Sequence, residues 1–75
     1  METRESDLNR AAFLLAKGVK LARLEGVGHK VFIFEDPDNQ IEYLKVEFTN
    51  NGLVPVSSFI SAQRELKSLI YGDKR

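Results

Sequence analysis

The chain has 75 residues, equal numbers of acidic and basic residues, and no cysteine. A chain of this length forms one domain with a small core, and without cysteine it has neither a disulfide nor a thiolate metal site. Its neutral total charge argues against strong binding of polyanions, which requires many lysine and arginine contacts.

The composition, 43% hydrophobic and 29% charged residues, is typical of a folded globular domain. No apolar run approaches the ~20 residues needed to cross a bilayer. The charged start, Met1–Asp7, lacks the pattern of a secretory signal. We therefore expect a cytoplasmic protein without membrane association. It should form one domain over residues 1–75, with residues 1–6 and 72–75 frayed.

A first helix is predicted from Leu8 to Gly18. Ser6 or Asp7 can cap its start by accepting a hydrogen bond from a backbone N–H one turn on. The apolar residues that follow keep helical spacing. Gly18 can adopt the left-handed conformation that ends a helix.

Two strands joined by a glycine turn are predicted next. Residues 19–24 alternate between apolar and basic side chains with a slight irregularity, which indicates a half-buried strand. The segment Gly26-Val27-Gly28 favours a hairpin turn. The unbroken apolar run Val31–Phe34 is typical of a strand buried on both faces.

A second helix is predicted after this hairpin. Asp36-Pro37 fits a helix entrance, with the aspartate as cap and the proline in the first turn. Ile41, Leu44 and Phe48 keep helical spacing, and Asn51-Gly52 supplies a stop. Residues 44–48 also alternate as a strand would, and Asn51-Gly52 would then be a second hairpin turn. The length and the Asp-Pro cap favour the helix.

A last helix is predicted from Ser57, as its cap, to Gly72. Its apolar positions form one amphipathic stripe, namely Phe59, Ile60, Ala62, Leu66, Leu69 and Ile70. The fold class is therefore α+β: helix, strand, strand, helix, helix, with a β-hairpin packed against the helices. Three short helices hardly cover both faces of a strand such as Val31–Phe34. This predicts a homodimer; the alternative is a monomer whose helices wrap the hairpin.

The candidate metal and catalytic residues have simpler interpretations. Asp36, Asp38, Gln40 and Glu47 fall at ligand positions of a calcium loop, but Ile41 stands where that loop needs glycine. We predict no metal site.

His29 lies beside the glycine turn and is expected to be solvated. The adjacent Glu35 and Asp36 point to opposite faces of an extended strand and cannot act together on one bond. No acid, base and nucleophile constellation is visible. We predict no catalytic residues, no cofactor and no enzymatic activity.

Basic residues are concentrated in one part of the chain. Between residues 10 and 30, five of them oppose the single acid Glu25. They are the candidate nucleic-acid-binding residues: Arg10, Lys17, Lys20, Arg23 and Lys30. In a hairpin, Lys20 and Lys30 are expected to come near each other. Two functions remain: a protein-interaction or adaptor module with an unidentified partner, or a nucleic-acid-binding accessory protein that uses these five residues.

Three blocks carry a resemblance to a known family. They are AAFLLAKG at residues 11–18 after Asp7-Leu8, VFIFED at 31–36, and LKSLIY at 66–71. Over residues 7–71 the chain is similar to a family of short bacterial and phage-associated domains of unknown function. The resemblance implies a helix in residues 38–50. It implies no activity and no catalytic residue.

Overall fold

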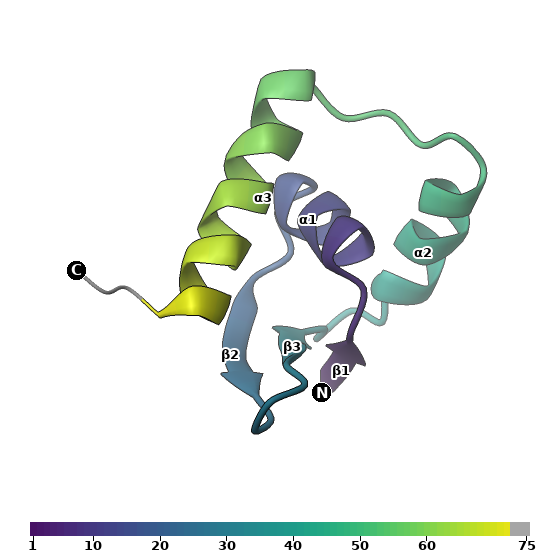
Figure 1. Ribbon diagram of the computed structural model, residues 1–75. Coiled ribbons are helices and arrows are strands. Elements are labelled where there is room, and N and C mark those ends of the chain that lie inside the picture. Colours follow the sequence, from purple (N-terminus) through teal and green to yellow (C-terminus); the bar gives the residue numbers. More distant parts are fainter. Residues whose placement is uncertain (73–75) are drawn as a thin grey trace.

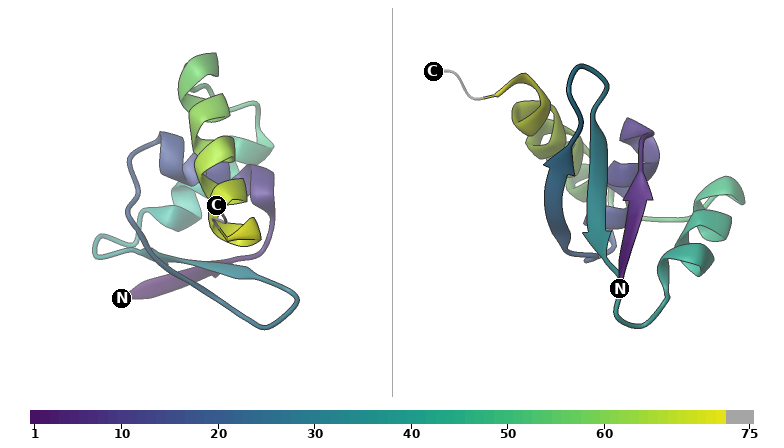
Figure 2. Two further views of the ribbon diagram at one scale, coloured as in Figure 1. Left: turned by 60° about the vertical axis from the view of Figure 1, so that its left-hand side comes forward. Right: turned by 90° about the horizontal axis from the view of Figure 1, so that it is seen from below.

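The computed structural model describes residues 1–72 of the chain, which form two layers (Figure 1). One layer is an antiparallel sheet of β1 (Glu2–Glu5), β2 (Leu21–Glu25) and β3 (Val31–Glu35), with β3 in the middle. The other holds α1 (Leu8–Ala16), α2 (Ile41–Thr49) and α3 (Val56–Tyr71). Helices α1 and α3 cover one face of the sheet, and α2 stands beside α1, past the β1 edge (Figure 2). The predicted α+β class is confirmed, with one additional strand.

Both ends of α1 follow the prediction. The Asp7 side chain caps the helix by accepting a hydrogen bond from the Arg10 N–H at 2.7 Å. At the other end Gly18 has a φ of +96°, and the N–H groups of Gly18 and Val19 donate to the carbonyls of Leu15 and Leu14. These two bonds are those of a Schellman motif, which turns the chain sharply toward β2.

The hairpin of β2 and β3 is confirmed, including its irregularity. A register shift between Leu21 and Arg23 leaves Leu21 opposite Phe34 and Leu24 opposite Phe32. Because residues opposite each other share a face, both leucines face the helices and Arg23 faces away. Gly26 has a φ of +107°, and a Cβ there would collide with the His29 carbonyl. A glycine is therefore required at this turn.

The prediction that residues 1–6 are frayed is wrong for residues 2–5. They form β1, which pairs with β3 so that Thr3 lies opposite Phe34 and Glu5 opposite Phe32. The Asp36 N–H also donates to the Met1 carbonyl at 2.8 Å. The segment lacks the apolar residues that mark a strand in a sequence. It is a strand because it satisfies the second edge of β3.

The face of the sheet opposite to the helices is covered by charged side chains. Ile33 lies on this face between Arg4 and Arg23, yet it is only 2% exposed. Arg23 donates two hydrogen bonds of 2.8 Å to Glu2 and one of 2.7 Å to Glu25. The hydrogen bonds from Arg23 hold the pKa of both carboxyls below their usual value. Long charged side chains can cover apolar surface in this way.

This layer of ion pairs bears on the predicted homodimer. That prediction rests on the need of β3 for cover on both of its faces. Within one chain, α1 and α3 cover one face (Figure 2), the ion pairs over Ile33 cover the other, and β1 pairs with the remaining edge of β3. The homodimer stays a prediction, but its original reason no longer holds.

Residues 41–49 form a helix and not a strand, as predicted, but the predicted start of α2 at Asp36-Pro37 is wrong in detail. The helix begins at Ile41, and residues 37–39 form a turn in which Asn39 has a φ of +53°. The buried Asp36 still caps the helix across this turn, because its Oδ1 accepts from the N–H groups of Gln40 (2.8 Å) and Ile41 (3.3 Å). Its Oδ2 accepts from the Thr3 hydroxyl at 3.2 Å.

Helix α3 begins two residues earlier than predicted. Pro55 occupies the cap position without a side-chain hydrogen bond, and Ser57 lies within the first turn and caps nothing. The helix ends at Tyr71, followed by Gly72. Residues 73–75, which were expected to be frayed, lie outside the described residues.

The core lies between the sheet and the helices. It is a cluster of buried side chains from all three helices, from β3 and from the connection between α1 and β2: Ala11, Ala12, Leu14, Val19, Phe32, Phe34, Ile41, Ala62 and Leu66. In the part of the chain that is described, no helix is long and apolar enough to cross a membrane.

A buried carboxylate, Glu5, joins three elements. It is 3% exposed and accepts from the Asp7 N–H (2.8 Å) and from Arg10 Nε (3.0 Å), and Lys45 Nζ of α2 lies 3.4 Å away. Burial raises the pKa of Glu5, but the hydrogen bonds from Arg10 and Asp7 and the charges of Arg10 and Lys45 outweigh it. The pKa therefore lies below the ordinary value of 4.5.

The variant Glu5→Gln tests this junction. We expect it to lower the free energy of unfolding by about 1–3 kcal/mol, because hydrogen bonds to a charged group are lost. A lowered pKa in the folded state stabilises the protein above pH 4.5, and this contribution is lost as the pH falls through the folded-state pKa. Urea unfolding between about pH 6 and pH 3 should therefore depend less on pH in the variant. Glu42→Gln, on the exposed side of α2, is the control. Equal stability of Glu5→Gln and this control would contradict the role of Glu5.

Candidate functional site

The five predicted nucleic-acid-binding residues do not form one surface. Three of them pair with carboxylates, which removes most of their attraction for phosphate. The pairs are Arg10–Glu5 at 3.0 Å, Lys17–Glu47 at 2.9 Å and Arg23–Glu2 at 2.8 Å.

The other two, Lys20 and Lys30, lie at opposite ends of the hairpin. The Lys20 carbonyl accepts from the Glu35 N–H, so Lys20 lies opposite the end of β3. Lys30 precedes β3, and its Nζ donates to the Gly26 carbonyl at 3.1 Å. The expectation that these lysines approach each other is wrong, because in an antiparallel pair the start of one strand lies opposite the end of the other. The arrangement disfavours a shared phosphate-binding surface.

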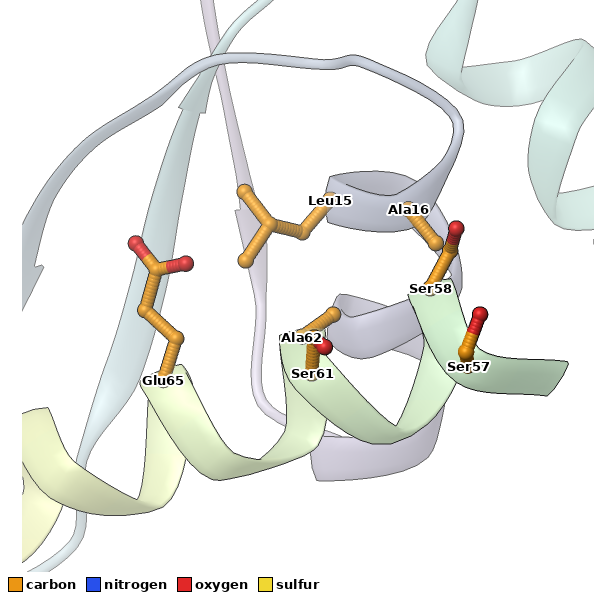
Figure 3. A pocket seen from close by; sticks show the side chains of 7 residues that line it. All are labelled: Leu15, Ala16, Ser57, Ser58, Ser61, Ala62 and Glu65. Atoms are coloured by element: carbon orange, nitrogen blue, oxygen red, sulfur yellow. The ribbon is translucent and has the colours of Figure 1, made fainter. Parts of the chain in front are cut away.

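A first cleft, of about 340 Å³, lies between the end of α1 and the first half of α3. Figure 3 shows Leu15 and Ala16 facing a row of α3 side chains that runs to Glu65. The row contributes three hydroxyl groups, those of Ser57, Ser58 and Ser61.

The chemistry of this cleft is limited. A serine acts as a nucleophile when a base within hydrogen-bond reach takes its proton. Within residues 1–72, no hydrogen bond joins Glu65 to any of the three serines. The turn between β2 and β3, which contains His29, lies at the opposite end of the molecule from the start of α3 (Figure 1). The cleft offers polar groups for binding but no activated nucleophile.

The acidic residues considered as calcium ligands do not gather around one point, and two of them make other contacts. The Asp36 carboxylate is engaged by backbone N–H groups of α2 and by Thr3. Glu47 pairs with Lys17. In the described part of the chain, no three His, Cys, Asp or Glu side chains gather in a way that could hold a metal ion.

The second hollow is an apolar groove of about 360 Å³, which we call the phenylalanine groove. It lies among α1, α2, the segment that crosses above α1, and the start of α3 (Figure 1). Its lining is mostly apolar and includes one phenylalanine from each of the three helices. The lining residues are Phe13, Phe48, Asn51, Gly52, Leu53, Val54, Val56 and Phe59.

The walls of the phenylalanine groove are fixed by contacts between helices. The rings of Phe13 and Phe48 pack at 5.4 Å between centroids and 59° between planes. The Lys17 Nζ lies 5.5 Å from the centre of the Phe13 ring and pairs with Glu47 across α1 and α2. By contrast, the rim is open, since Leu53 is 82% and Val56 73% exposed. An apolar hollow with a rigid floor and an exposed apolar rim suits an apolar side chain of a ligand.

Sequence reasoning missed this groove. It assigned Phe48 and Phe59 to the apolar stripes of their helices. The available signal was the segment Leu53–Val56, which is apolar although it lies between two helices. The sequence does not show which helices this segment lies against, because that depends on the tertiary arrangement.

Gly52 allows the connecting segment to pass close to Phe13. A Cβ at this position would lie 2.8 Å from Phe13 Cζ and 2.7 Å from the Glu47 carbonyl oxygen. We expect Gly52→Ala to lower the free energy of unfolding by about 1–3 kcal/mol through overpacking. Thermal unfolding measures this, with Asn50→Ala in the same exposed segment as control. A Gly52→Ala protein as stable as the control would contradict the close approach.

The dispersed basic residues lead to a second expectation. A 20-base-pair duplex of random sequence should not bind the full chain at low salt, because paired cations release few counterions. Fluorescence anisotropy of labelled duplex measures this. Binding that is abolished by charge reversal at Lys20 and Arg23 would contradict the expectation and restore the nucleic-acid hypothesis.

Comparisons with known proteins bear on the family alone. Neither the curated proteins nor the solved structures gave a match. One family model, described as a domain of unknown function, DUF5659, matches residues 3–72. This range includes the three blocks that carry the resemblance found in the sequence, and also most of β1. The chain therefore belongs to the DUF5659 family, whose function is unknown.

Proposed function

We propose that the protein is a small non-enzymatic interaction module, and that the phenylalanine groove receives a side chain of its protein partner. The supporting observation is the convergence of three phenylalanine residues from three helices on one open hollow. In protein interfaces most of the affinity comes from a few side chains that fill well-packed, desolvated pockets near the centre of the interface.

The exposure of the rim supports this proposal. Leu53 and Val56 stand mostly in water beside the groove, and Ile60 follows one turn later on α3 with 42% exposure. Single exposed apolar residues are ordinary. A contiguous group that borders a concave apolar site is typical of a binding surface.

The edges of the sheet favour the groove over strand pairing as the binding mode. Both β1 and β2 are edge strands. β1 has only four residues, three of them charged, and β2 carries the irregularity near Ala22. Short, charged or bulged edges are features that discourage pairing with another strand. A second copy of the chain, as in the predicted homodimer, would then bind through the groove.

The distribution of polar groups supports a non-enzymatic role. The β2–β3 turn, which carries the candidate general base His29, lies at the opposite end of the molecule from the start of α3 with its serines (Figure 1). A general base must reach the proton that it removes, directly or through one water. The proposal also retains the expectation of a bacterial or phage-associated origin, which follows from the resemblance, and the expectation of a cytoplasmic location.

Photo-crosslinking in bacterial cells that produce the full chain tests the proposal. A benzophenone amino acid replaces Leu53 at the groove or, as control, the fully exposed Val27 at the hairpin. We expect a crosslinked protein from position 53 and none from position 27. A product of twice the chain mass would identify a second copy as the partner. No product, or equal products from both positions, would overturn the proposal.

A matched pair of variants adds a second criterion. Val56→Asn makes the rim polar, whereas Ser57→Asn changes the neighbouring residue on the side of the serine cleft. Valine, serine and asparagine have similar helix propensities, so neither change should unfold α3. The crosslink from position 53 should weaken at least about tenfold in Val56→Asn, since a buried apolar contact is lost. It should persist in Ser57→Asn.

A further inference from the structure

We infer that the partner of the phenylalanine groove is an acidic amphipathic helix, held by the groove at one end and by Arg64 and Lys67 at the other. This inference rests on the proposed function and adds the chemical class of the partner.

One face of α3 continues the groove along the helix. At 100° per residue, Val56, Ile60 and Lys67 lie within about 40° of each other around the axis, and Arg64 lies about 40° further. All four residues are exposed. Val56 also lines the groove, so the apolar hollow and this face form one surface.

The charge along this surface is uneven. Arg64 and Lys67 form no ion pair with any residue in the range 1–72, unlike the paired cations of α1 and β2. The acid of the same helix segment, Glu65, lies about 100° beyond Arg64, on the side of the serine cleft. At the groove itself, Lys17 and Glu47 neutralise each other at 2.9 Å. The surface is therefore apolar and neutral at one end and positive at the other.

The spacing defines the partner. Eleven residues separate Val56 from Lys67, which is ~16 Å along α3 at 1.5 Å per residue. Beside this face the boundary between α3 and α1 carries a neutral polar contact, because Gln63 Nε2 donates to Asn9 Oδ1 of α1 at 2.7 Å. A helix of about three turns covers this distance, with apolar side chains one turn apart at one end and carboxylates at the other.

Two cations favour a peptide over a membrane surface. Anionic membranes are bound through clusters of basic residues, each contributing a modest amount. The two cations on this face are too few for such a cluster. They suffice to select an acidic partner and to speed its association.

Three synthetic 18-residue helical peptides test the inference. They share leucines at positions i, i+4 and i+7 and differ at the opposite end, which carries glutamate, glutamine or lysine. Fluorescence anisotropy at low salt should show the glutamate peptide binding the full chain about tenfold tighter than the glutamine peptide. The preference should disappear at about 0.5 M salt. NMR shifts should locate the peptide at Leu53, Val56 and Lys67.

Variants of single cations provide the controls. Lys67→Gln and Arg64→Gln should each reduce the preference about threefold and leave the affinity for the glutamine peptide unchanged. Lys20→Gln removes an exposed cation outside this surface and should change nothing. An unchanged preference in the first two variants would overturn the inference.

The remaining outcomes separate the two proposals. Equal binding of all three peptides at the groove would overturn the inference about charge and leave the interaction module intact. Binding of anionic phosphatidylserine vesicles in place of the peptides would overturn it in favour of a membrane. If no peptide binds, the inference falls, and the proposed function is decided by crosslinking from position 53, which does not depend on the charge of the partner.

Discussion

The pairing of β1 with β3 is the constraint on which the rest of the structure depends. It places Thr3 beside Asp36 and buries Glu5 between α1 and α2. Asp36 then binds the first N–H groups of α2, and Glu5 attracts Lys45 in the same helix. Helix α2 packs mainly against α1 and has few packing contacts with the other elements. Two buried carboxylates, one in the N-terminal strand and one that accepts a hydrogen bond from it, therefore help to hold this helix in place.

The position of α2 in turn creates the phenylalanine groove. Phe48 reaches Phe13 because α2 lies against α1, and the chain crosses above α1 to reach α3 (Figure 1). The shape of the groove therefore depends on the polar contacts that hold α2 in place. A binding site on a peripheral helix differs from one in the core, because its stability comes from charged hydrogen bonds as much as from apolar burial.

Features that depend on neighbouring residues could be predicted from the sequence. The Asp7 cap, the end of α1 at Gly18 and the glycine hairpin each follow from the conformational preference of one or two residues. The strand β1 could not be predicted, because its residues are polar and its partner is thirty residues away. Asp36 was identified as a cap, but not as one acting across a turn. The basic residues were found from local charge, whereas two of their carboxylate partners, Glu47 and Glu2, come from elements distant in the sequence. The groove requires three helices at once.

Hydrogen exchange measured by NMR tests the central role of β1 most directly. Three amides report on it: Asp36 N–H, which donates to the Met1 carbonyl; Asp7 N–H, which donates to Glu5; and Gln40 N–H, which donates to Asp36. If β1 is an integral strand, all three should exchange as slowly as Glu35 N–H, which bonds to the Lys20 carbonyl within the hairpin. If they exchange at the rate of an unfolded chain while Glu35 stays protected, β1 does not hold α2, and the account is wrong.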